Sequence, residues 1–245
     1  MDRWLLESNQ YDLLRDGTWI TLQILFFAFL LGVLLSLLFG VARLSEREWV
    51  RGAALVYVEI ARGISSIILL FVIAIAIPIL LEVEQASLVL LGSIALGLNM
   101  GGYGAEIVRG SIQAIPKGQT EASIALNLSP TQRLRYVVLP QAMRIILPPM
   151  GNLTIEILKG TALVSLIGLT DIMAATNTIR NQRLVNASGA DVTVVFANAL
   201  VIYFVIAQVI NLLFRLGERR LESRYRGGAA EVEAATHEPV PGLTK

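Results

Sequence analysis

The sequence of 245 residues contains no cysteine and one histidine, His237, which lies near its C-terminal end. The absence of cysteine excludes disulfides, thiolate nucleophiles and cysteine-ligated metal sites, and we interpret His237 as a solvated side chain. The sequence also lacks the phosphate-binding patterns GxxxxGKS and GxxxxGKT, and no glycine directly precedes a lysine. The chain therefore cannot form a Walker-type nucleotide cradle. We expect it to have no catalytic residues, no metal and no cofactor of its own.

Charged side chains are also scarce. They make up 16% of the residues, against 55% hydrophobic residues, and the mean hydropathy of +0.65 is above the usual range of soluble proteins. The net charge is only +1, so the charge balance gives no indication of a nucleic-acid partner. This composition is typical of a protein whose main contact is the lipid bilayer.

Five apolar segments are long enough to cross the hydrocarbon core of a bilayer, which is about 30 Å thick and needs roughly 20 helical residues. None of them shows sustained alternation of apolar and polar residues. The sequence therefore predicts an all-α integral membrane protein with five transmembrane helices rather than a barrel. The predicted spans are residues 19–42, 53–81, 86–107, 145–168 and 192–214.

The basic residues next to these spans predict the orientation of the chain. They gather after the first, third and fifth spans, and arginine and lysine next to a span mark its cytoplasmic end. We therefore expect the N-terminus outside and the C-terminus in the cytoplasm. The residues concerned are Arg43, Arg47 and Arg51, then Arg109, Lys117, Arg133, Arg135 and Arg144, and finally Arg215, Arg219, Arg220, Arg224 and Arg226.

Three regions follow from this pattern. Residues 1–16 mix apolar and charged side chains, so we expect an extracytoplasmic segment that lies at the membrane interface. Residues 17–217 form one membrane domain. Residues 218–245 begin with a basic stretch and continue as a small, polar tail rich in glycine and proline, which we expect to be disordered in the cytoplasm.

A polar, basic loop, residues 116–140, separates the third and fourth predicted spans. Residues 119–126 have helical spacing, and Asn127 tolerates the left-handed conformation that ends many helices. Ser129, with proline after it and glutamine three residues on, predicts a capping box that starts a second short helix. The loop is therefore expected to form two short helices joined by a sharp bend.

This loop resembles the EAA loop of the membrane-spanning permease subunits of bacterial ABC importers. Ser123 stands where that family has its second alanine, and Asn127 where it has glycine; both fit the bend. The flanking runs AEIVRG (105–110) and LPPMGN (147–152) resemble the polar-amino-acid branch, and the resemblance covers residues 17–217. The loop residues that match the motif positions are Glu121, Ala122, Ser123, Asn127, Leu139 and Pro140.

The resemblance implies a type I ABC importer permease (MetI-like) fold with cytoplasmic coupling helices, in the bacterial inner membrane. It implies a second permease subunit, identical or homologous, an extracytoplasmic solute-binding protein, and two cytoplasmic ATPase subunits that bind ATP and Mg. In that family the bent loop sits in a cleft of the ATPase and carries its motion to the pore. The six motif residues are therefore candidate ATPase-coupling residues. Glu121 would cap its own helix or meet a cation of the partner.

The fourth predicted span carries charges at membrane depth, where each ion costs at least about 2.5–3.5 kcal/mol. Glu156 and Lys159 are three residues apart and can pair; they either meet a zwitterionic solute or form an intrahelical pair that supports packing. Pro148 and Pro149 predict a hinge or the start of the helix. The candidate solute-pathway residues are Asn152, Thr154, Glu156, Lys159, Thr161 and Ser165.

Four further charges lie near helix ends and predict ion pairs there, with direct solute contact as the alternative: Glu59, Arg62, Glu106 and Arg109. Many relatives have a proline just after the segment equivalent to Arg62, whereas this chain has isoleucine and two serines, which predicts a straighter second span. Gly97 and Gly101 predict a close approach between helices.

The leading hypothesis is the permease subunit of an ATP-driven ABC importer for polar amino acids, without enzymatic activity of its own. Residues 159–165 also resemble permeases for ectoine-type compatible solutes, which are the alternative substrate class. A third hypothesis is a secondary transporter driven by an ion gradient, with Glu156 as its protonatable site. That mechanism predicts inverted repeats and midplane charges in both halves. A purely structural membrane subunit would not need the charged pair.

Overall fold

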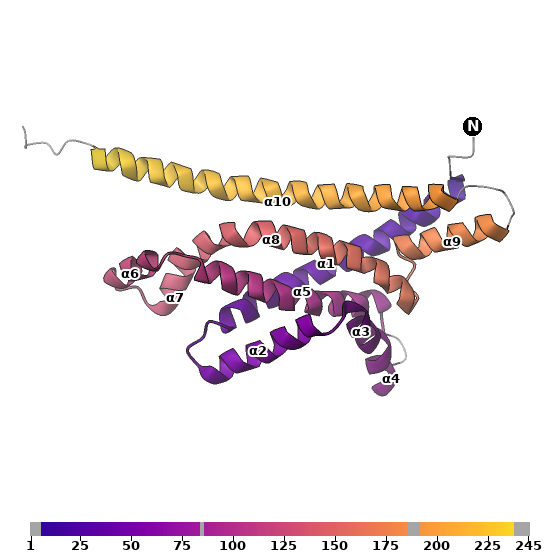
Figure 1. Ribbon diagram of the computed structural model, residues 1–245, viewed down its shortest axis with the longest axis horizontal. Helices are drawn as coiled ribbons and strands as arrows, with labels where there is room; N and C mark the ends of the chain where they lie inside the picture. The colour runs from indigo at the N-terminus through magenta and orange to yellow at the C-terminus, as the bar shows by residue number, and fades with distance from the viewer. Residues whose placement is uncertain (1–5, 84–85, 186–191, 238–245) are drawn as a thin grey trace, which may run out of the picture.

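The computed structural model describes residues 6–83, 86–185 and 192–237, with side chains through residue 222. All of its regular structure within these residues is helical, and the long helices lie along one another in an elongated bundle (Figure 1). The α-helices are α1 (Ser8–Ala42), α2 (Glu48–Gly63), α3 (Ser66–Phe71), α4 (Ile77–Leu80), α5 (Leu88–Gln113), α6 (Lys117–Ala125), α7 (Pro130–Arg133), α8 (Leu139–Gly160), α9 (Ile172–Val185) and α10 (Val192–His237).

Four helical stretches are long and apolar enough to cross a membrane, and α2 with α3 and α4 forms a fifth if this bent pair counts as one span. The prediction of five spans is therefore consistent with the structure. The second span is not straight, however: the helix axis bends by 103° between α2 and the α3–α4 half. The missing proline was a misleading signal, because side chains of α5 and not a proline ring hold this bend.

Two short π-helical segments occur within spans, Val72–Ala76 before α4 and Leu134–Val138 before α8. In both, the last N–H bonds five residues back, from Ile77 to Val72 and from Leu139 to Leu134. A proline follows directly in each case. Proline has no N–H to donate. Just before it, the backbone hydrogen bonds shift from the carbonyl four residues back to the carbonyl five residues back, and the helix continues.

The fourth span contradicts the expected break. Helix α8 neither starts nor ends at Pro148 and Pro149 but runs through both. Each proline removes one hydrogen bond, and packing against α5 on one side and α10 on the other supports the helix across the gap. The span then narrows to a 3₁₀ helix, Thr161–Ile167, which ends at Gly168 with φ of 91°.

Both ends of the chain are more helical than expected. Helix α1 starts at Ser8, so residues 8–16 belong to the same helix as the first span, and their position at the membrane interface stays a prediction. Helix α10 continues to His237, where the sequence predicted a disordered tail. The alanines and glutamates before His237 are good helix formers. Residues 1–5 and 238–245 lie outside the described part of the chain.

Helices α1 and α5 pack closely along their length, and glycine permits this. A Cβ atom added at Gly40 of α1 would lie 2.6 Å from Cβ of Val108 and 2.9 Å from the Ala105 carbonyl oxygen. One added at Gly97 of α5 would lie 3.0 Å from the Leu31 side chain. The close approach predicted from the glycines of the third span is therefore made with α1.

We expect Gly40→Ala to lower the apparent melting temperature of the detergent-purified protein, because overpacking costs about 1–3 kcal/mol. The matched control is Gly110→Ala, since no described atom outside the neighbouring backbone of its own helix lies within 4 Å of the Cβ position there, and alanine in a helix is intrinsically better than glycine. Thermal unfolding followed by circular dichroism measures both. Equal melting temperatures for the two variants would contradict this account of the α1–α5 contact.

Candidate functional site

The loop between α5 and α8 forms the bent pair of short helices that its sequence predicts, and it lies at one end of the bundle (Figure 1). Asn127 has φ of 57°. The Leu128 N–H donates to the Ser123 carbonyl at 3.1 Å, and the Asn127 N–H donates to Ile124 at 2.8 Å. These two bonds close α6 as a Schellman motif. Asn127 thus replaces the family's glycine without opening the bend.

The second helix of the loop starts with the expected capping box. The Gln132 N–H donates to Oγ of Ser129 at 3.4 Å, and the Ser129 N–H donates to Oε1 of Gln132 at 2.9 Å. At the base of the loop, Gln141 donates to Gln119 at 3.1 Å. The loop is therefore held both by its own caps and by a link to the start of α8.

The loop presents a mixed polar and apolar surface. Glu121, Ala122 and Asn127 are exposed, whereas Ser123 is buried and donates to the Thr120 carbonyl at 2.6 Å. Leu139 and Pro140 are half-buried at the base. Sequence reasoning missed the exposed apolar side chains beside them: Ile124, Leu126 and Tyr136, of which Leu126 is 75% exposed. Apolar side chains gathered on one exposed loop indicate a protein contact.

Glu121 does not cap its own helix. Helix α6 starts after Pro116 without a side-chain cap, and Glu121 makes no hydrogen bond or ion pair within the described residues. Its carboxylate is thus available to a cation of another protein.

The candidate pathway residues divide into two groups. Asn152, Glu156 and Lys159 are exposed and lie on one face of α8, because residues four and seven apart share a helix face. Thr154 and Thr161 are buried and donate to backbone carbonyls three or four residues back, and half-buried Ser165 does the same. Only the first group presents its polar atoms to an open surface.

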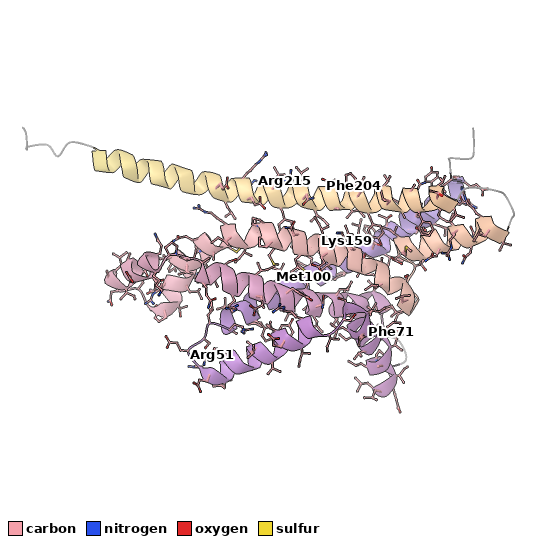
Figure 2. All side chains as sticks on the ribbon, in the orientation of Figure 1. Arg51, Phe71, Met100, Lys159, Phe204 and Arg215 are labelled. Carbon is pink, nitrogen blue, oxygen red and sulfur yellow. The ribbon has the colours of Figure 1, made fainter. Side chains whose placement is uncertain are left out.

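The intrahelical pair between Glu156 and Lys159, one of the two alternatives, does not form, since the two side chains share no contact of 4.0 Å or less. Both side chains extend into open space. In Figure 2, Lys159 is marked midway along the bundle. The structure thus leaves two opposite charges separately available on one face of the helix.

Side chains of α5 hold the bend between α2 and α3. Nδ2 of the buried Asn99 donates to the Ala61 carbonyl at 2.9 Å, and its Oδ1 accepts from the Ser66 hydroxyl at 3.1 Å. The Tyr103 hydroxyl donates to the Arg62 carbonyl at 3.3 Å. These bonds pair carbonyls of the last turn of α2, which the end of the helix leaves open. Asn99 was missed by sequence reasoning, although an asparagine amid apolar residues requires hydrogen-bond partners.

The helix-end charges form one of the two expected pairs. Glu106 binds Arg109 and also Arg43, each at 2.7 Å, so it joins α5 to the end of α1. The partner from α1 was not predicted. Glu59 makes no ion pair with any described residue, and Arg62 instead lies over the Tyr103 ring, 5.5 Å from its centre. The ion pairs expected at the helix ends therefore form at Glu106 and Arg109 but not at Glu59 and Arg62 among the described residues.

A buried carboxylate fixes the other end of the bundle. Asp171 caps α9, accepting from the Met173 and Ala174 N–H groups at 3.1 and 3.0 Å. Burial raises the pKa of Asp171 above its usual value, although these two backbone N–H groups act in the opposite direction. A Cβ at Gly17 would lie 2.7 Å from the Asp171 carbonyl oxygen, so α1 is pressed against this corner. Asp171 was also not predicted.

Among the described residues, no group of three His, Cys, Asp or Glu side chains is placed to hold a metal ion. The polar groups point instead to binding and to mechanical contact: a projecting loop at one end, a charged helix face at membrane depth and a bent span.

Residues 30–226 match the sequence model of the family described as the binding-protein-dependent transport system inner membrane component. The chain belongs to this family. The permeases of this family are membrane subunits of ABC importers, so the chain is a multi-pass inner-membrane transport subunit and not itself an enzyme. The expected family is thereby confirmed.

The chain is similar over most of its length to permeases of amino acid transporters. It is 41% identical to the "Probable amino-acid ABC transporter permease protein y4tF" of Sinorhizobium fredii, over 87% of this chain and 89% of that protein. It is 32% identical to the glutamine transport system permease protein GlnP of Escherichia coli, over 86% and 93%. These similarities support the polar-amino-acid branch of the family; none of them concerns ectoine.

Solved structures confirm the expected fold. The crystal structure of an amino acid ABC transporter with histidines superposes with a TM-score of 0.73 at 30% identity, covering 86% of this chain and 94% of that one. The inward-facing MetNI methionine ABC transporter gives a TM-score of 0.71 at 22% identity, which bears on the fold alone. The permease thus has the type I, MetI-like fold.

We expect Asn99→Ala to destabilise this permease by about 1–3 kcal/mol, because the buried Ala61 carbonyl loses its partner. Asn152→Ala removes an asparagine from the exposed face of α8 and is expected to leave the melting temperature unchanged. Thermal unfolding in detergent compares the two. The role given to Asn99 fails if both variants melt together with the unaltered protein.

Proposed function

We propose that this permease forms part of the solute pathway of an ATP-driven importer for polar amino acids and is driven by a separate ATPase subunit. The observation that carries this proposal is the bent α6–α7 loop. It projects from one end of the bundle, with exposed apolar side chains beside Glu121, which has no partner among the described side chains. The sequence has no nucleotide cradle of its own.

The charge distribution supports a cytoplasmic position for this loop. Arginines and lysines cluster next to the ends of the first, third and fifth spans, and the loop lies at the end of the third. Two ATPase subunits, which carry the ATP and Mg, dock on two such loops. The opposite end, where Asp171 caps α9, is then extracytoplasmic and receives solute from a binding protein.

The exposed face of α8 supports a solute pathway shared with a second permease subunit, identical or homologous. Leaving Glu156 and Lys159 against lipid would cost at least about 2.5–3.5 kcal/mol for each ion. A second subunit covers this face and encloses water between the two. Glu156 then meets the ammonium group of a zwitterionic solute, and Lys159 meets its carboxylate.

The transporters to which this chain is similar favour amino acids over ectoine-type solutes as the cargo. The resemblance of residues 159–165 to permeases for ectoine-type solutes keeps those solutes as the second candidate, since they are also zwitterions. The ion-gradient mechanism is disfavoured, because midplane charges occur in one half of the chain and the family is that of ABC importers.

Glu121→Lys is expected to uncouple the transporter. Reversing the charge places like charges at the ATPase contact, which costs several kcal/mol, so ATP-dependent uptake into vesicles falls by at least about tenfold. Membrane insertion stays intact, because Glu121 has no partner among the residues that the structure describes. ATP hydrolysis continues but no longer responds to solute-loaded binding protein.

Glu46→Lys is the matched control, since Glu46 is exposed on the side assigned to the cytoplasm but lies in the loop after α1. It should transport as the unaltered protein does. Normal ATP-dependent uptake by the Glu121→Lys variant would refute the coupling role of the loop.

Glu156→Gln and Lys159→Gln are each expected to reduce kcat/KM for uptake by about 10- to 100-fold, because each removes a charged hydrogen-bonding group that meets the solute. Basal ATP hydrolysis by the complex should persist. Asp12→Asn, on the extracytoplasmic end of α1, is the control for Glu156→Gln, since it removes the same negative charge.

Uptake of labelled glutamine and of labelled ectoine, with ATP supplied or withheld and the ion gradient collapsed, identifies the cargo class and the energy source. Uptake that survives ATP withdrawal but is lost with the gradient would establish the secondary-transport mechanism instead.

A further inference from the structure

An apolar crevice of about 870 Å³ lies between α1, α8 and α10. Its walls include Phe26 and Leu30 of α1, Val209 and Leu213 of α10, and Leu147 of α8. Among the described residues that line it, Gln23 carries the one amide, Thr154 the one hydroxyl and Trp19 an indole N–H. The Thr154 hydroxyl already donates to the Met150 carbonyl. None of the functions assigned above uses this crevice.

The crevice is elongated. A second cavity of about 190 Å³ continues it and shares Phe29, Leu147 and Phe214 with it. Its lining is apolar apart from Ser36, whose hydroxyl donates to the Gly32 carbonyl. The rings of Phe29 and Phe214 meet edge to face between the two, with centres 6.2 Å apart. Along α1 the two cavities extend from Trp19 to Leu37, about 27 Å at 1.5 Å per residue, which approaches the hydrocarbon thickness of about 30 Å.

The position of the crevice indicates where its occupant comes from. Two of its walls, α1 and α10, are spans by length and hydropathy, so the crevice opens into the hydrocarbon layer and not into water. Trp19, at one end, is 63% exposed, as expected of a tryptophan at the headgroup level. A long, apolar slot with an aromatic end fits an acyl chain.

The other end of the crevice is basic. Arg144 precedes Leu147 by three residues on α8, and Arg220 follows Leu213 by seven on α10, so each arginine continues the crevice face of its helix. Between Leu213 and Arg220, Gly217 faces Leu147, which would lie 2.9 Å from a Cβ there. The apolar surfaces of both helices thus end in arginine where the two helices meet.

We propose that this crevice binds an anionic phospholipid, with an acyl chain in the slot and the headgroup at Arg144 and Arg220. Basic sites between spans on the cytoplasmic side bind anionic lipid headgroups. Helix α1 packs mainly on α5 and α9, and α10 on α8 and α9. The acyl chain therefore fills the space that separates α1 from α10.

The test uses the complete transporter in nanodiscs with phosphatidylglycerol that carries a photoreactive diazirine in its acyl chain. Peptides with Phe26–Phe27 and with Val209–Leu213 should be labelled. Val209→Trp with Leu213→Trp fills the slot and lowers that labelling by at least about tenfold. Val205→Trp with Leu212→Trp adds the same bulk to exposed positions of α10 outside the crevice and leaves it unchanged. Equal labelling of the two double variants overturns the proposal.

The headgroup is tested separately. Phosphatidylglycerol should label the crevice at least about fivefold more than phosphatidylcholine, and Arg144→Gln with Arg220→Gln should abolish this preference. Arg215→Gln with Arg219→Gln removes the same charge at positions of α10 beside the crevice. This control pair should retain the preference for phosphatidylglycerol. The headgroup assignment is overturned if the preference is lost in the Arg215/Arg219 variant or survives in the Arg144/Arg220 variant. Elution of each variant as an intact complex verifies that it is folded.

A second copy of the chain is the competing occupant. Because the natural sequence has no cysteine, Leu213→Cys introduces a single reactive thiol in the crevice. We expect no disulfide-linked dimer on oxidation in the membrane. An efficient cross-link between two copies would show that protein covers the crevice and would refute the lipid assignment.

Discussion

The structure depends above all on one constraint: hydrocarbon offers no hydrogen-bond partners to a polar backbone. Two kinds of irregularity in the spans are accordingly satisfied from within the protein. Before Pro78 and Pro140 the helical ladder shifts by one residue and continues. Where α2 ends, Asn99 and Tyr103 supply donors to the open carbonyls. The bend of the second span is thus a stable feature, because α5 completes its hydrogen bonding.

The same requirement distinguishes the closely packed pair α1 and α5 from helix α8, which has an exposed polar face. Helices α1 and α5 meet through glycines and share the Glu106 ion-pair network, so they form a fixed wall. Against this wall, α8 presents Asn152, Glu156 and Lys159 on an open face. The α6–α7 loop sits directly between α5 and α8 in the chain. A force on this loop therefore reaches the end of the fixed wall and the start of the charged helix together.

The lipid crevice extends this view to the membrane side. Charged groups of α8 require cover by protein or water, whereas the slot between α1 and α10 is nearly devoid of polar side chains and is compatible with hydrocarbon. Polar and apolar openings of the bundle thus call for different occupants. A bound acyl chain would fill the gap between α1 and α10, where the side chains are too small to do so. Because the two helices would then not interlock through side chains, α10 would have room to move relative to α1.

Local signals in the sequence were sufficient for the features they govern. The apolar runs determined the number of spans, and Asn127, Ser129 and Gln132 determined the bend of the loop, because helix caps depend on residues within one or two turns. Tertiary structure alone decided the rest. The partners Asn99–Ala61 and Arg43–Glu106 are 38 and 63 residues apart, so they depend on which helices meet. The apolar crevice likewise follows from packing, which no short stretch of sequence specifies.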